Sequence, residues 1–178
     1  MEKIRNIFKN KVLVLDGAMG TMVQSYNLSE NDFRGERFKD HPNDLKGNNE
    51  VLSLTRPDVI SAIHRSYLEA GADIIETNTF SANSISQKDY NLEDFSYELN
   101  KASAEIAKIE TQKFSNSPKY VAGAIGPTNR TASLSPDVNN PGFRNVNFDM
   151  LKESYAEQVR GLYAVSYTHL TLPTICSV

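Results

Sequence analysis

The sequence predicts an α/β protein with parallel strands. Three apolar runs, at 12–15, 73–80 and 120–127, each end in polar residues. Segments with helical periodicity lie between and after these runs. Strands that alternate with helices form parallel sheets with right-handed crossovers. The pattern is typical of an open doubly wound sheet and equally of the start of a (β/α)8 barrel, and by itself it does not choose between them.

The first expected strand, 12–15, is apolar and rich in β-branched residues, and it ends at Asp16. Gly17 and Gly20 follow, which allow a sharp turn and a close approach of a ligand to the backbone. Ligands of α/β proteins bind at the carboxyl ends of strands, so Asp16 is a candidate ligand contact. The alternative is a plain turn in which Asp16 caps a nearby group.

A long polar connection, about 22–55, follows the first strand. It is longer than an ordinary βα loop, and such long loops are often functional. A helix is then expected from Pro57, which suits a first turn, with Asp58 near the positive end of its dipole. Gly71 lies where a C-terminal cap belongs. The apolar positions of this helix are Ile60, Ile63, Tyr67 and Leu68.

The second expected strand is 73–80, followed by a short helix near 81–88 and a longer one at about 95–112. The third strand, 120–127, is interrupted at its end by glycine and proline. A last helix is predicted over 148–162. The expected apolar faces are Leu99, Ala102, Ile106 and Ile109 in the long helix, and Leu151, Tyr155, Val159 and Leu162 in the last one.

The composition is that of a globular protein with no nucleic-acid or membrane partner. The 178 residues are 39% hydrophobic and 23% charged, with a net charge of −3 that disfavours nucleic acid and anionic lipid. The sequence holds neither a membrane-span run nor a signal-peptide core, so a cytoplasmic location is expected. Cys176 is the single cysteine, which excludes an internal disulfide and a multi-cysteine metal site.

Polar residues at the strand exits are the candidates for chemistry. Asp16 can accept hydrogen bonds from a cationic amine, or act as a base where it is desolvated. Glu76 to Thr79 leave the second strand on alternating sides, so only some face a common centre. Glu76 and Asn78 alternatively only join neighbouring strand ends.

The other polar groups are less specific. The run 126–130 can meet an anion or a polar cofactor, but it lacks the spacing of a phosphate-binding loop, so nucleotide binding is unsupported. Ser133 to Asp137 is predicted to form a locally capped turn. His64 is expected to be a packed or surface histidine, because no second histidine or acid stands at a metal-binding spacing from it.

Taken together, these stretches resemble the homocysteine S-methyltransferase family. The resemblance lies in 15–21, 54–58 and 69–80, in that order. The runs 122–131 and 133–138 are more specific. They are similar to the N-terminal, homocysteine-binding module of cobalamin-dependent methionine synthase rather than to the betaine-using relatives.

The resemblance implies a (β/α)8 barrel in which zinc binds the homocysteine thiolate and lowers its pKa. The sulfur then takes a methyl group from methylcobalamin, and methyltetrahydrofolate supplies that group on downstream modules of the same polypeptide. Carried over to this sequence, Asp16 and Gly17 contact the amino-acid end of homocysteine, with Asp16 as the partner of the ammonium group. Asn78, Thr79, Thr128 and Asn129 line the same mouth.

Two departures limit what is expected of this chain. The family's three zinc cysteines are missing, since Cys176 stands in no such context. Three βα units also do not close a barrel that needs eight strands and about 250 residues. We therefore expect a partial barrel of about three βα units, without catalytic or metal residues of its own, that binds neither zinc nor cobalamin and is inactive alone.

The last residues depart from the family pattern after about Tyr163. The run 165–174 has no charged residue and no helical periodicity, and it resembles the translated read-through of a transposon-end sequencing adapter. We expect 1–163 to be the N-terminal part of the barrel domain and 164–178 to be a non-native tail. The alternative is a divergent β-strand.

The leading interpretation is thus a fragment of methionine synthase, whose full enzyme is a methyltransferase. Two alternatives remain. One is a betaine-type or other cobalamin-independent homocysteine S-methyltransferase, and the other is a small-molecule binding domain without catalysis.

Overall fold

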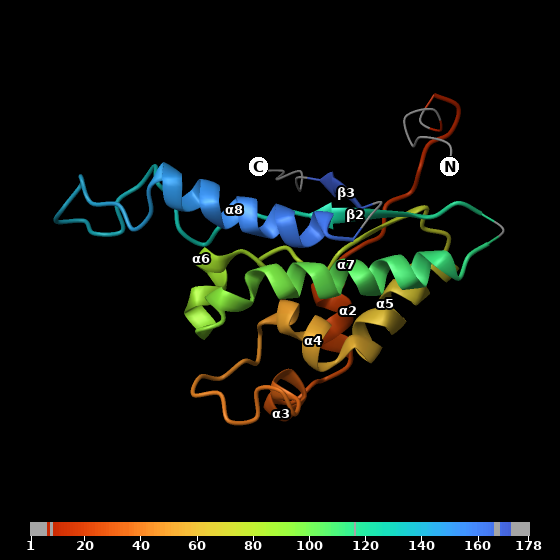
Figure 1. Ribbon diagram of the computed structural model, residues 1–178, viewed down its shortest axis with the longest axis horizontal. Helices are drawn as coiled ribbons and strands as arrows, with labels where there is room; N and C mark the ends of the chain where they lie inside the picture. Colours follow the sequence, from red (N-terminus) through yellow and green to blue (C-terminus); the bar gives the residue numbers. More distant parts are fainter. Residues whose placement is uncertain (1–6, 8, 116, 166–167, 172–178) are drawn as a thin grey trace.

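A small parallel sheet organises the structure, a computed structural model that describes residues 7, 9–115, 117–165 and 168–171 (Figure 1). The strands lie in the order β1-β2-β3. The strands are β1 (Ile74–Glu76), β2 (Tyr120–Ala124) and β3 (Thr168–Thr171), and the longer helices are α5 (Pro57–Glu69), α7 (Ser96–Gln112) and α8 (Phe148–Tyr163). The short helices are α2 (Met19–Ser25), α3 (Glu30–Arg34), η1 (Asn49–Val51), α4 (Leu52–Thr55), α6 (Ser84–Gln87), η2 (Lys88–Tyr90) and η3 (Glu93–Phe95).

The sheet and its helices repeat the βα order that the sequence predicts. β1 pairs with β2 in parallel, with Ile75 opposite Val121, and β2 pairs with β3 in parallel. Ile75 and Val121 are buried together with Leu68 of α5 and Ala107 of α7. Helices α5, α7 and α8 pack in that order, and they contact β1, β2 and β3 respectively. The described residues thus form a partial α/β layer structure. Strand β3 falls within the segment 164–178.

The first expected strand is only partly formed. Leu15 makes an isolated parallel bridge to Ile74, and the run 12–15 is not a regular strand. It is also not buried, because Val12 is 88% and Val14 55% exposed. The segment is held instead by Asp73, whose carboxylate pairs with Lys11 at 2.7 Å and accepts the N–H of Val14 at 3.1 Å. Val12, Val14 and Leu15 are thus exposed, whereas Leu13 is partly buried.

The predicted ends of α5 are confirmed. Pro57 occupies the first turn, and Asp58 pairs with Arg56 at 2.8 Å. Gly71 has φ +107°, and the N–H groups of Gly71 and Ala72 bond to the carbonyls of Leu68 and Tyr67. This is the Schellman arrangement, which favours glycine at the left-handed position. The helix therefore ends at Glu69, and the chain turns at Gly71 before β1 begins at Ile74.

The predicted apolar face of α7 is partly wrong. Leu99 is buried, but Ile109 is 54% exposed. The buried side of the helix is broader and more polar than the sequence pattern indicates, because α7 contacts α5, β2 and α8 at once. Its buried residues are Ser96, Leu99, Asn100, Ser103, Ala104, Ala107 and Glu110. Helix α8 instead keeps Leu162 fully buried, as expected, with Tyr155 and Val159 packed beside it.

The polar connection 22–55 is a folded layer rather than a loop. Its apolar residues join those of α5 in the largest apolar cluster of the described residues, with Phe33, Leu45 and Leu52 among the buried members. The connection ends in η1 and α4, which place Asn49 and Glu50 beside the strand ends.

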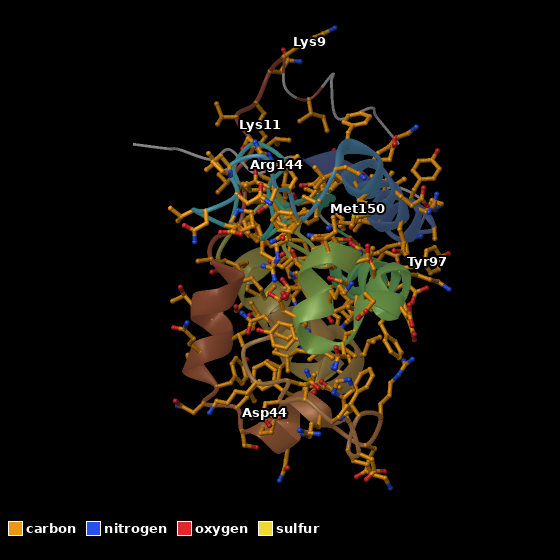
Figure 2. All side chains as sticks on the ribbon, turned by 90° about the vertical axis from the view of Figure 1, so that its left-hand side faces the viewer. Lys9, Lys11, Asp44, Tyr97, Arg144 and Met150 are labelled. Carbon is orange, nitrogen blue, oxygen red and sulfur yellow. The ribbon has the colours of Figure 1, made fainter. Side chains whose placement is uncertain are left out.

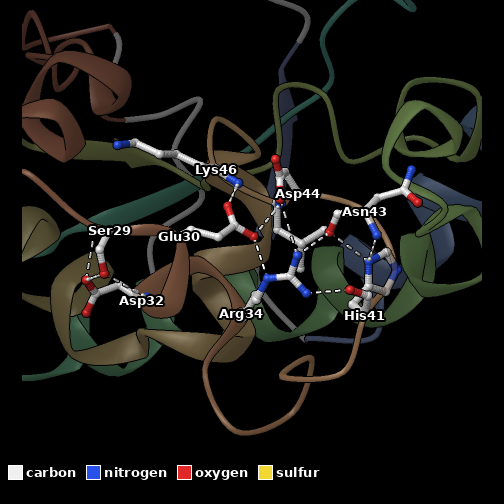
Figure 3. A network of polar contacts seen from close by, with 9 residues as sticks. Ser29, Glu30, Asp32, Arg34, His41, Asn43, Asp44 and Lys46 are labelled. Atoms are coloured by element: carbon white, nitrogen blue, oxygen red, sulfur yellow. Dashed lines mark hydrogen bonds and ion pairs between the residues drawn. The ribbon is translucent and has the colours of Figure 1, made fainter.

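Arg34 fixes the course of this connection (Figure 3). It pairs with Glu30 at 2.7 Å and donates to the carbonyls of His41 and Asn43. Glu30 in turn accepts the N–H of Lys46 at 2.7 Å. The two side chains therefore hold the segment before η1 in one place, and with it the wall of the site described below.

The segment 125–147 extends past the end of α8 (Figure 1). The Ser135 hydroxyl accepts the N–H of Asp137, which confirms the predicted local turn. Arg144 donates to the carbonyls of Ala132 and Pro141, so the segment is closed by its own hydrogen bonds. Within the part of the chain that the structure describes, no helix is long and apolar enough to cross a membrane.

Candidate functional site

A polar cavity of about 540 Å³ opens at the carboxyl ends of the strands. This is the edge at which parallel α/β sheets bind their ligands. It is bounded by the turn after the first strand, the residues around η1, and the chain that leaves β1. The lining residues include Asp16, Gly17, Gly20, Asn49, Glu50, Glu76, Asn78, Thr79, Phe80 and Ser81.

Asp16 is the chemically distinctive side chain of this cavity. Its Oδ2 accepts the N–H of Glu76 at 3.0 Å, while its Oδ1 is buried and has no hydrogen-bond partner. Burial raises the pKa of Asp16 to about 7; the N–H of Glu76 acts against this, whereas the Glu76 charge adds to it. A desolvated carboxyl oxygen without a partner is costly unless a ligand donates to it. The geometry therefore favours a ligand that carries a hydrogen-bond donor or a positive charge.

Gly17 lets the turn after Asp16 lie on α5. A Cβ at this position would stand 3.1 Å from the hydroxyl oxygen of Tyr67, which is tight but involves the end of a side chain. The same hydroxyl donates to the carbonyl of Ala18 at 3.4 Å. Tyr67 therefore supports the turn that carries Asp16 and Gly17 into the cavity.

The polar residues after β1 mainly hold the walls of the cavity. The Thr79 hydroxyl donates to the carbonyl of Ala124 at 2.7 Å, and the Thr77 hydroxyl accepts the N–H of Ala124 at 3.0 Å. Asn78 donates from Nδ2 to the carbonyl of Asn49 at 2.7 Å. The predicted alternation is present, since the threonines face β2 and Asn78 faces η1. Asn78 lines the cavity and also joins its two walls.

Glu50 is a site residue that was not predicted from the sequence. It is 8% exposed, it lines the cavity, and its Oε1 accepts the N–H of Ser81 at 2.9 Å. Burial raises the pKa of this carboxyl. The available signal was an acid at the end of a polar Gly-Asn-Asn run, directly before the apolar helix that follows.

The remaining two candidates, Thr128 and Asn129, line a second cavity of about 380 Å³ instead of the first. Asn129 donates to Asp89 at 2.6 Å, and the N–H of Thr128 donates to the hydroxyl of Tyr155 at 3.2 Å. The two cavities are adjacent, because they share the lining residues Gly47, Glu50, Phe80 and Ser81. The structure thus divides the predicted substrate residues between neighbouring cavities.

The described residues do not fit a zinc ion. No group of three or more His, Cys, Asp or Glu side chains among them is placed to hold a metal. Cys176 lies outside the described residues. His64 is fully buried, as the packed alternative predicted, and both of its ring nitrogens lack hydrogen-bond partners.

The fold and the cavity define a class: an α/β protein with an acid-lined cavity at the carboxyl ends of parallel strands. The model of the homocysteine S-methyltransferase family matches residues 13–178. The chain belongs to this family.

Solved structures support the fold. The metallated form of the homocysteine methyltransferase MmuM from Escherichia coli matches with a TM-score of 0.69 at 20% identity, over 96% of this chain and 57% of that chain. The oxidised form of MmuM gives a TM-score of 0.67 at 19% identity, over 94% of this chain and 55% of that one. The chain spans little more than half the length of MmuM.

Proposed function

We propose that the chain is the N-terminal part of a homocysteine S-methyltransferase, and that the 540 Å³ cavity holds the amino-acid end of homocysteine. The proposal rests mainly on one observation: Oδ1 of Asp16 is buried and has no hydrogen-bond partner. The homocysteine ammonium group supplies both the hydrogen-bond donor and the positive charge that this oxygen lacks. Family membership supports the same substrate.

The described residues bind and orient the substrate in this proposal. The N–H of Glu76 fixes one oxygen of Asp16 and leaves the other for the ammonium group. An approaching cation favours the ionised form of Asp16 and returns its pKa toward the ordinary range. Asn78 keeps the η1 wall against the strand end, so the cavity has its shape before the ligand enters. Because binding does not have to order these groups, less affinity is lost.

We further propose that the parent enzyme is of the cobalamin-dependent methionine synthase type. The runs 122–131 and 133–138 support this choice over a betaine-type enzyme. In that type, bound methylcobalamin supplies the methyl group that the homocysteine sulfur accepts. Reading the gene beyond codon 163 for the family's three cysteines and for folate and cobalamin modules tests the assignment. A gene without those modules would favour the cobalamin-independent alternative.

The same DNA tests the origin of the segment 164–178, which we propose is non-native. We expect the genomic frame to diverge from the printed sequence near Tyr163. An uninterrupted genomic frame that encodes the printed tail would show that the segment is native.

The ammonium contact predicts a ligand-specific effect of Asp16→Asn. The amide keeps an acceptor for the Glu76 N–H but removes the charge, so homocysteine should bind about tenfold more weakly. 4-Mercaptobutanoate, which is homocysteine without its amino group, should bind both variants alike. Isothermal titration calorimetry on the 178-residue chain measures both ligands.

Asp89→Asn is the matched control, because it neutralises an acid that lines only the second cavity. It should leave homocysteine binding unchanged. Equal homocysteine affinity in Asp16→Asn and wild type would contradict the assignment of Asp16 to the ammonium group.

A further inference from the structure

Glu50 occupies a position that the proposed function does not yet use. Among the residues that the structure describes, it is the one titratable side chain that lines both cavities. Hydrogen bonds of the residues before it in the chain, and of the segment that contains Ser81, hold Glu50 in place. Asn48 donates to Gln87 at 2.7 Å, Gln87 donates to the carbonyl of Ser81 at 3.0 Å, and Asn78 holds the neighbouring carbonyl of Asn49.

The surroundings of Glu50 are acidic. Asp16 and Glu76 line the first cavity with it, and Asp89 and Tyr90 line the second. Neither lining contains Lys, Arg or His among the described residues. Arg130 is a nearby cation, and it pairs with Asp89 at 2.8 Å.

These surroundings favour the neutral acid. An ionised Glu50 would be a buried charge that only backbone N–H groups stabilise, those of Ser81 and of Glu50 itself. Two further acids, Asp16 and Glu76, line the same cavity. Burying a charge without a compensating partner is far more costly than burying a hydrogen-bonded neutral group. Burial accordingly raises the pKa of Glu50.

We propose that Glu50 carries its proton and donates a hydrogen bond to the carboxylate of the amino-acid ligand whose ammonium group lies against Asp16. This inference rests on the proposed function and adds the second half of the recognition. Two acids in one cavity then have opposite roles: the ligand's ammonium group keeps Asp16 ionised, and the ligand's carboxylate keeps Glu50 neutral. A zwitterionic ligand meets both: its cation faces a carboxylate, and its anion faces an acid that donates a proton in a hydrogen bond.

Glu50→Gln is the decisive variant, because an amide reproduces the donor and the acceptor of a protonated acid and cannot ionise. We expect Glu50→Gln to bind homocysteine within about threefold of wild type at the acidic end of the pH series, below the pKa of Glu50. Above the pKa of Glu50 the wild type should lose affinity relative to this variant, since the ligand carboxylate then faces an anion. The ratio of the two dissociation constants, measured by calorimetry across pH, removes the titration of the ligand and of Asp16, which both variants share.

Glu50→Ala supplies the ligand-specific arm of the test. It should weaken homocysteine about tenfold and leave 3-aminopropane-1-thiol, which lacks the carboxylate, nearly unchanged. Alanine also removes the acceptor for the Ser81 N–H, so the thermal midpoint of this variant is recorded first. The pH profile of Glu50→Gln decides the question where Glu50→Ala does not fold.

The outcomes separate the two proposals. A wild type that binds homocysteine, with equal losses in Glu50→Gln and Glu50→Ala, would show that the charge of Glu50 is needed and would overturn this inference alone. An affinity ratio between wild type and Glu50→Gln that does not change with pH would overturn it as well. A wild type that binds neither homocysteine nor 3-aminopropane-1-thiol would overturn the proposed function, and this inference with it.

Discussion

Gly161→Ala is expected to destabilise the protein by about 2–3 kcal/mol, although alanine is the better helix former. Gly161 lies in α8 where it crosses α7. A Cβ at this position would stand 2.6 Å from the carbonyl oxygen of Tyr97 and 2.7 Å from the Cβ of Asn100. Both contacts are with the body of α7 rather than with the end of a flexible side chain. Alanine therefore has to push the helices apart, and this cost exceeds the gain in helix propensity of about 1 kcal/mol.

The separation of α7 from α8 would also disturb buried polar groups. Asn100 is fully buried and donates to the carbonyls of Ala82 and Ser96, both at 2.7 Å. Gln158, on the α8 side, donates to the carbonyl of Thr79 at 2.8 Å. Tyr97 lies at the edge of the molecule, with a partly exposed side chain (Figure 2), and because the clash is with its main-chain carbonyl, a movement of that side chain would not relieve it. A shift of α8 would thus reach the chain that forms the floor of the cavity.

Urea unfolding measures the effect, with Gly20→Ala as the matched control. Gly20 is also a helical glycine, in α2, but its Cβ would meet its nearest atom, Asn49 Nδ2, at an ordinary 3.6 Å. The control should be neutral or gain up to about 1 kcal/mol from helix propensity. An unchanged unfolding midpoint in Gly161→Ala would mean that α7 and α8 are not in close contact.

The strand exits were the most predictable part of the site, because their signal is local. A strand that ends in an acid and glycines brings that acid to the sheet edge whatever packs around it, so Asp16 was found. The same holds for Gly71, since only a left-handed cap explains glycine at the end of a helical pattern. Such features need no knowledge of distant residues.

The residues that were missed or misplaced depend on contacts that are distant in sequence. Glu50 belongs to a polar run that gains its meaning only when Ser81 and Asn78 fix it beside the strands. Ile109 is exposed because α7 has three neighbours, which turn its buried side toward Ser103 and Glu110. Asn129 follows the correct strand, but its side chain is bound to Asp89 on η2. The spacing of apolar and polar residues along the sequence does not predict contacts of this kind.

Two buried groups, His64 and Asp16, should make opposite contributions to the pH dependence of stability between pH 7.5 and 5. Burial lowers the pKa of His64 to about 4, against a slight opposing effect of Glu110. The unfolded histidine takes up its proton near pH 6.5, so stability is complete above that value and falls as pH drops toward 4. Asp16 behaves oppositely. Its folded pKa of about 7 exceeds the unfolded value of 3.8, so stability rises as pH falls from 7 toward 4.

Each group contributes about 2 kcal/mol over this interval, and Asp16 somewhat less because solvent screens part of its charge. His64→Met removes the acid-labile group together with two ring nitrogens that lack partners, so this variant should gain stability relative to wild type as pH falls from 7.5 to 5. Asp16→Asn should lose stability relative to wild type over the same interval. The double variant should have nearly the pH dependence of wild type, because the two contributions are similar in size, and the two sites share no hydrogen bond or ion pair, so their effects should add.

Urea unfolding of the four proteins at the two pH values measures the effects, and the difference within each variant removes any change in packing that does not depend on pH. The same pH slope in Asp16→Asn and in wild type would show that Asp16 ionises normally in the free protein. The ammonium contact would then lose its physical basis, since an oxygen that is already well solvated gains little from a ligand's positive charge.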